Sequence, residues 1–290
     1  MSEALGDFLA RHRGEWEVLA DAEALTSAPS ARQMRSDLLA CVGAHADDPF
    51  PIASGSDEAV LDQLRIGYRR ILLGIAARDL SGLATMDTVA MWLSDLADCV
   101  LEAALAVARA DVGAAADQCR FAVIGMGKCG ARELNYVSDV DVIFVAEPVE
   151  GADEARAMAA ATSLATGLMR ACNAVTPEGT IWEVDAALRP EGKQGALVRT
   201  IASHVGYYER WAKTWEFQAL LKARPVAGDR ARTLGGCPAA RPPPSCCPRP
   251  CCSRPAAAAD RSPRTPRARG RSDLGSGNPT AGWPGSARRP

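Results

Sequence analysis

Two aspartates separated by one residue, Asp139 and Asp141, follow a turn that runs Gly125-Met126-Gly127-Lys128. An apolar run precedes the turn and another begins at the aspartates, so we expect both acids at the start of a buried strand. Side chains of a strand alternate between its two faces, which puts Asp139 and Asp141 on the same side. Two carboxylates beside a glycine turn suit the binding of a divalent cation next to a phosphate.

A third acid, Asp185, lies in the apolar segment 180–188, which predicts another strand. The same alternation puts Arg189 on the face of Asp185, roughly 13 Å further along at ~3.3 Å per residue. We expect the following loop, residues 190–195, to be flexible and to present Lys193. A metal ion could then lie at one end of a nucleotide-sized ligand and a cationic side chain at the other.

The elements that must position these residues are short strands among helices. Strands are expected at residues 121–124 and 140–145, with a short helix from Ala131 between them. The helical period of the apolar residues predicts a helix over 153–173. A final amphipathic helix is expected from Ser203, with Glu216, Gln218, Lys222 and Arg224 as polar groups near its end, which taken alone indicate a solvated face.

Residues 1–118 have helical periodicity throughout. Helices are expected over residues 1 to about 22, over 31–44 and from residue 56. A further long helix follows a cap at Asp87, and we expect the last two to pack as a hairpin. The domain division predicted from these patterns is a helical region 1–118, a sheet domain 119–230 and a tail 231–290.

The tail differs sharply in composition from the rest of the chain. Residues 231–290 hold 12 of the 19 prolines and 11 arginines but only two acids, so the net charge of −2 combines an acidic body with a basic tail. An acidic body argues against nucleic acid as a partner. Two leucines and one tryptophan in the tail cannot offset the entropy of folding, so we expect it to be disordered.

The ten cysteines divide evenly between body and tail. The five of the body are scattered without paired spacing, as expected of buried thiols in a reducing compartment. The tail cluster from Cys246 to Cys252 lacks the CxxC spacing and nearby histidine of a zinc site, so translational noise explains it better.

No apolar run reaches the ~20 residues that cross a membrane, and the N-terminus lacks a signal-peptide pattern. The cytoplasm is the expected location.

The turn lacks the third glycine of a dinucleotide-binding fingerprint and the GK-[ST] ending of a P-loop. Instead, the glycine turn, ten intervening residues, the DVDV motif and the later Asp185 together resemble the nucleotidyltransferase superfamily of the polymerase β type. The resemblance implies an α+β fold with a small mixed sheet. It implies that Asp139, Asp141 and Asp185 hold two Mg²⁺ ions for catalysis. It also implies ligand-binding roles for Gly125, Gly127, Lys128 and Ser138 at the phosphates, and for Arg189 and Lys193 at the attacking phosphate or AMP.

Three longer segments carry a closer resemblance: GMGKCGARELNYVSDVDVIFV, WEVDAALRPEGKQGALV and YYERWAKTWEFQALLKARPVAGD. They resemble the family of bifunctional glutamine synthetase adenylyltransferase/adenylyl-removing enzymes, whose members carry two nucleotidyltransferase copies. One copy removes AMP from a tyrosine of glutamine synthetase by phosphorolysis, and the other adds AMP from ATP. The resemblance implies glutamine synthetase as protein substrate, AMP, ADP or ATP as nucleotide, and the PII signalling protein as a further partner.

Residues 132–138, RELNYVS, look like the adenylyl-removing copy, because the adding copy typically has glycine in place of Asn135. The family pattern stops near Asp229, and the tail resembles a GC-rich gene read out of frame, so we expect a truncated chain. Two alternatives stay open: an inactive fragment that retains metal or nucleotide binding, and the ATP-dependent adding copy. A small-molecule nucleotidyltransferase would share the aspartates but not the RELN and RPEG segments.

Overall fold

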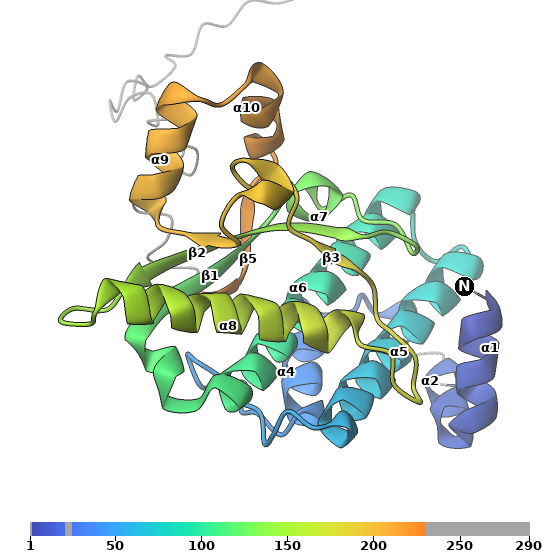
Figure 1. The fold of residues 1–290 in the computed structure, drawn as a ribbon. Helices are drawn as coiled ribbons and strands as arrows, with labels where there is room; N and C mark the ends of the chain where they lie inside the picture. The colour runs from blue at the N-terminus through green and yellow to red at the C-terminus, as the bar shows by residue number, and fades with distance from the viewer. Residues whose placement is uncertain (1, 21–24, 230–290) are drawn as a thin grey trace, which may run out of the picture. The chain divides into compact units, whose positions relative to one another are not determined.

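A mixed β-sheet carries the three aspartates. The computed structural model describes residues 2–20 and 25–229, and within them five strands follow the order β3-β2-β1-β5, with β4 also paired to β2. β1 runs antiparallel to β2 and β5, whereas β3 and β4 run parallel to β2. The strands are β1 (Cys119–Gly125), β2 (Val140–Pro148), β3 (Val184–Asp185), β4 (Val198–Arg199) and β5 (Arg224–Gly228). Helices surround this small sheet (Figure 1), which confirms the α+β fold with a small mixed sheet expected from the sequence.

Helices fill the described part of residues 1–118. Ser30, Asp57 and Thr85 each cap a helix by accepting a hydrogen bond from the backbone N–H three residues later. The expected cap at Asp87 is wrong, because the Thr85 hydroxyl takes that role. None of the described helices combines the length and apolarity needed to cross a membrane. The elements are α1 (Ser2–Arg11), η1 (Arg13–Trp16), α2 (Glu17–Ala20), α4 (Ala31–Cys41), α5 (Glu58–Leu80), α6 (Met86–Val112) and η2 (Gly113–Gln118).

Two helices expected to be continuous are interrupted. The first breaks after Arg11 into a 3-10 turn that contains Gly14, a residue with low helix propensity. The last breaks at Trp211 and resumes at Thr214. The short helix expected to begin at Ala131 instead ends there. The remaining elements are α7 (Gly127–Ala131), α8 (Glu154–Asn173), η3 (Gly192–Gln194), α9 (Ile201–Arg210) and α10 (Thr214–Leu220).

The expected strand over residues 180–188 is much shorter in the structure, where β3 comprises two residues. The Asp185 carboxylate accepts a hydrogen bond from the Ala187 backbone N–H at 2.8 Å, and this local turn competes with continued strand pairing. β4 and β5 were not predicted, because neither has a long apolar run. β5 contains Pro225, which is tolerated because the strand lies at the edge of the sheet.

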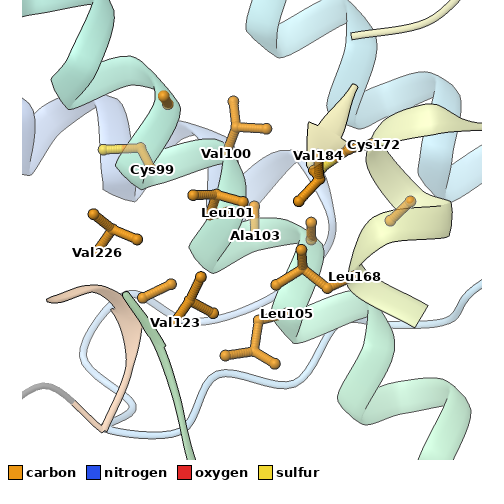
Figure 2. Close-up of a cluster of buried hydrophobic side chains, with 14 of the residues drawn as sticks. Cys99, Val100, Leu101, Ala103, Leu105, Val123, Leu168, Cys172, Val184 and Val226 are labelled. Carbon is orange, nitrogen blue, oxygen red and sulfur yellow. The ribbon is translucent and has the colours of Figure 1, made fainter. Parts of the chain in front are cut away.

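Helix α6 is the centre of the core. From Leu96 to Ala108 its residues are buried on every side, as expected of a helix enclosed by protein. In Figure 2, Leu101 and Leu105 of α6 lie near Val123 and Val226 of the sheet, while Leu168 of α8 lies on the other side. Residues before and after position 118 share this core. The predicted division at residue 118 thus marks a change in secondary structure within one shared core. The division into domains stays a prediction.

The two faces of β2 pack against different partners. Val142 and Phe144 belong to the main core with α6 and α8, whereas Ile143 and Val145 belong to a second cluster with Met126. Residues of α9 and α10 pack on that second cluster. Because side chains alternate along a strand, Asp141 projects to the face of Ile143, away from the helical core. The helices α9 and α10 cover this face of the sheet (Figure 1).

The five cysteines outside the tail are free thiols, as predicted. Cys99, Cys119, Cys129 and Cys172 are buried, and Cys41 is half-buried. Burial raises the pKa of Cys119 to about 11, so this thiol stays protonated and unreactive at neutral pH. The tail cysteines lie outside the described residues. The predictions that they bind no zinc and that the tail is disordered concern that same segment.

Arg224 fixes the position of α7 from the edge strand. Its guanidinium donates two hydrogen bonds to Asp98 of α6 and others to the carbonyl oxygens of Cys129 (3.0 Å) and Gly130 (3.2 Å). The expected solvated face near the end of the last helix is therefore wrong for Arg224. It is also wrong for Glu216, which is 6 % exposed and accepts a hydrogen bond from Tyr207.

We expect Arg224→Met to lower the free energy of unfolding by about 3 kcal/mol, because Asp98 would keep its buried charge without the guanidinium. Urea denaturation measures the change. Arg170→Met is the matched control, since it removes a half-exposed ion pair with Asp111 and should cost less than about 1 kcal/mol. Equal losses in the two variants would contradict the role given to Arg224.

Candidate metal and nucleotide site

The structure brings the three aspartates together at the beginning of β2. Asp139 directly precedes the strand, Asp141 is its second residue, and Asp185 pairs with Asp141 in the parallel register of β3. One carboxylate oxygen from each of the three lies within 4.8 Å of the others. Asp139 is exposed and the other two are half-buried. Three oxygen donors at this spacing form a donor set that suits Mg²⁺ or Mn²⁺.

Backbone hydrogen bonds hold two of these acids in place. The Asp141 carbonyl accepts a hydrogen bond from the Met126 N–H at 2.8 Å, which ties β2 to the glycine turn. The Val140 N–H donates to the Glu183 carbonyl at 2.9 Å, which joins β2 to β3. The sheet and the turn therefore fix the spacing between Asp141 and Asp185 before any ligand is bound.

Gly127 lies directly against the carboxylate of Asp141. It begins α7 with a φ of +50°, a conformation that side chains other than glycine rarely adopt. A Cβ atom at this position would lie 2.3 Å from Asp141 Oδ2. Glycine is therefore required here twice, once by the backbone conformation and once by the close approach of the acid.

Gly125, the other glycine expected to approach phosphate, is buried at the end of β1. A Cβ atom there would lie 2.7 Å from a methyl group of Val226 in β5. The missing side chain of Gly125 thus allows β1 and β5 to pack closely, and the phosphate contact expected of this residue stays a prediction.

Lys128 and Ser138 connect the glycine turn to Asp139. The Lys128 ammonium donates to Ser138 Oγ and to Asn135 Oδ1, each at 3.4 Å, and Ser138 Oγ donates to Asp139 Oδ1 at 3.4 Å. These hydrogen bonds are long and the Lys128 side chain is exposed, so its ammonium can move to an incoming anion. Sequence reasoning treated Asn135 only as a family marker, and its place beside Lys128 was not anticipated.

The electrostatics of the site favour a bound cation. Burial raises the pKa of Asp141 first, and the charges of Asp139 and Asp185 raise it further, while Lys128 opposes them. Both causes disfavour the ionised carboxylate in the protein alone. A divalent cation among the three acids would remove the repulsion that they exert on one another.

Arg189 does not lie along an extension of the strand as expected, because β3 ends at Asp185. Its guanidinium donates to the carbonyl oxygens of Ala186 (2.7 Å), Lys193 (3.1 Å) and Gly195 (3.1 Å). The loop expected to be flexible is thus closed by Arg189 and contains the 3-10 turn η3. Lys193 is exposed in this loop. Contacts of Arg189 and Lys193 with a phosphate stay predictions.

Comparison with known proteins identifies the family. The family model described as glutamate-ammonia ligase adenylyltransferase matches residues 1–234. The chain is 54% identical over 228 residues to a Streptomyces avermitilis protein named bifunctional glutamine synthetase adenylyltransferase/adenylyl-removing enzyme. Proteins of the same name from Streptomyces coelicolor and Mycolicibacterium smegmatis are 54% identical over 231 residues and 50% identical over 234.

Each of these alignments covers 79% of this chain and 21% or 22% of the relative, so the chain spans about a fifth of the length of the curated relatives it matches. The family resemblance inferred from the sequence motifs is confirmed. On the family model and these relatives, the chain belongs to the glutamate-ammonia ligase adenylyltransferase family.

Proposed function

We propose that residues 119–229 form the adenylyl-removing nucleotidyltransferase domain of this family, and that they release AMP from modified glutamine synthetase as ADP. The observation that carries the proposal is the cluster of Asp139, Asp141 and Asp185 within 4.8 Å beside the Gly127 turn. Support for the removing direction comes from the RELNYVS sequence of residues 132–138. Support for the protein substrate comes from the names of the relatives.

The proposed reaction is an in-line displacement at phosphorus. An oxygen of inorganic phosphate forms a bond to the phosphorus of the AMP–tyrosine diester, the bond to the tyrosine oxygen breaks, and ADP and a free tyrosine hydroxyl result. Asp139, Asp141 and Asp185 would hold the Mg²⁺ ions, which supply neutralisation of the phosphoryl oxygens when bound. Lys128 and Lys193 are proposed to meet the remaining phosphate charge. Arg189 is proposed to shape the loop that presents Lys193, and its remaining N–H groups can donate to phosphate.

The proposed setting is the cytoplasm, which agrees with five free thiols in the described body and with a substrate that is a metabolic enzyme. The PII signalling protein stays an expectation from the family resemblance. The ATP-dependent adding direction is the second candidate, because the same three acids would serve it. In that direction a tyrosine oxygen attacks the α-phosphorus of ATP and pyrophosphate leaves.

The deciding experiment incubates the purified chain with AMP-modified glutamine synthetase, Mg²⁺ and phosphate, and measures ADP. We expect ADP release that requires both Mg²⁺ and phosphate and that disappears in Asp139→Asn. A parallel reaction with unmodified glutamine synthetase and ATP measures pyrophosphate. Pyrophosphate without ADP would assign the adding direction. If circular dichroism shows that the chain is folded and it forms neither ADP nor pyrophosphate, the result assigns it as an inactive fragment.

A further inference from the structure

Asp139 is the least supported of the three acids. It precedes β2, and the segment 132–138 before it has neither helical nor strand structure. The register of β2 and β3 begins at Val140, so the sheet fixes only one side of Asp139. The position of its carboxylate therefore depends on what holds segment 132–138.

Three side-chain contacts tie that segment to the helices α5 and α6, in addition to the contacts that Lys128 makes with Asn135 and Ser138 and the ion pair of Lys222 with Glu133. Arg132 forms an ion pair with Asp95 of α6. The Leu134 N–H donates to the hydroxyl oxygen of Ser94, a fully buried residue of α6, at 3.2 Å. The Tyr136 hydroxyl donates to Asp79 Oδ2 at 2.8 Å. Every second residue from Arg132 to Tyr136 therefore contacts the helical region just before Asp139.

The contact between Tyr136 and Asp79 is the nearest of the three to Asp139. Asp79 lies in the last turn of α5, where the helix dipole disfavours a negative charge, so the acid does not serve helix stability. The Tyr136 ring packs against the main core and is partly buried. Partial burial strengthens a hydrogen bond between a hydroxyl and a carboxylate. This pair links the helical region to the residue three positions before the metal-binding acid.

We propose that Tyr136, held by Asp79, is a positioning residue that places Asp139 for metal binding by the aspartate cluster. The inference rests on the proposed metal site. The helical region before residue 119 then contributes to cation binding. A substitution at the end of α5 changes the cation affinity through segment 132–138, although it does not alter the metal ligands. A purely structural contact would instead affect unfolding and leave the affinity of the folded chain unchanged.

The test measures Mn²⁺ affinity of the full chain by electron paramagnetic resonance of free Mn²⁺. We expect Tyr136→Phe and Asp79→Ala each to weaken binding about 3- to 10-fold. The double variant should be no weaker than either single variant, because both remove the same contact. Asp79→Asn keeps an acceptor oxygen and should recover most of the affinity. Hydrogen exchange of the amides in segment 132–138, measured without metal, should be faster in Tyr136→Phe than in the wild type.

Tyr68→Phe is the matched control, since it removes one hydroxyl from α5 about three turns before Asp79 and should leave Mn²⁺ affinity unchanged. Thermal unfolding of every variant separates loss of affinity from loss of folding. Unchanged affinity in Tyr136→Phe, or additive losses in the double variant, would overturn the positioning role while the metal site stands. Absence of Mn²⁺ binding in the wild type would overturn the metal site itself, and the inference with it.

Discussion

Asp141→Asn is expected to abolish stabilisation by divalent cations and to lower ADP release about a thousandfold or more. Asp141 is the second of the three acids along the chain. It pairs with Asp185 in the sheet, and its carboxylate lies against Gly127 of the glycine turn. At a Mg²⁺ concentration of about 100 times the Kd, bound cation would stabilise the wild type by about 2.7 kcal/mol. Thermal unfolding with and without Mg²⁺ measures this difference, and the variant should show none of it.

The same variant is expected to be more stable than the wild type when metal is absent. The pKa of Asp141 is raised by burial and by Asp139 and Asp185, so its ionised form costs folding free energy at neutral pH. Asparagine has the same shape without the charge, and the gain should be about 1 kcal/mol because solvent screens these partly exposed groups. As pH falls through the raised pKa, the wild-type carboxyl takes up a proton and the advantage of the variant should shrink.

The change in stability caused by Asp141→Asn should therefore have opposite signs with and without Mg²⁺. This reversal distinguishes a metal ligand from an ordinary structural acid. Asp111→Asn is the control, because it changes an exposed carboxylate that pairs with Arg170 outside the cluster. It should leave the Mg²⁺-dependent shift intact. A Mg²⁺-dependent shift of wild-type size in Asp141→Asn would contradict the proposed site.

The parts of the fold that the sequence predicts are those set by local patterns. The strands around Phe121 and Val142 have apolar runs bounded by turn residues, and the helix from Glu154 to Asn173 has a clear period and an Asp153 cap. β4 and β5 could not be predicted, because strands of two and five residues depend on pairing with β2 and β1.

The candidate site divides in the same way. The spacing of Asp139 and Asp141 and the motif resemblance sufficed to predict which acids lie together. The direction of the chain after Asp185 could not be predicted, because the aspartate side chain itself ends the strand by binding the Ala187 N–H. The supports from Asp79 and Arg224 were also missed. They act across more than fifty residues of sequence, and no local pattern marks them.

Gly127→Ala is expected to lower metal affinity and ADP release about 100-fold while costing only about 1 kcal/mol of stability. The new Cβ would lie 2.3 Å from Asp141 Oδ2, and the cheapest relief is rotation of that short side chain. Rotation leaves the fold intact but turns the carboxylate away from Asp139 and Asp185. A displacement of about 1 Å in a catalytic group is enough for losses of this size.

Gly151→Ala separates the clash from the backbone strain. Gly151 also has a positive φ, +81°, but a Cβ atom there meets nothing within 4 Å. Both variants should lose a similar free energy of unfolding, since both force alanine into the left-handed region. Only Gly127→Ala should lose Mn²⁺ affinity, because only there does the methyl group meet a metal-binding acid. Equal Mn²⁺ affinities in the two variants would mean that the glycine turn does not control the position of Asp141.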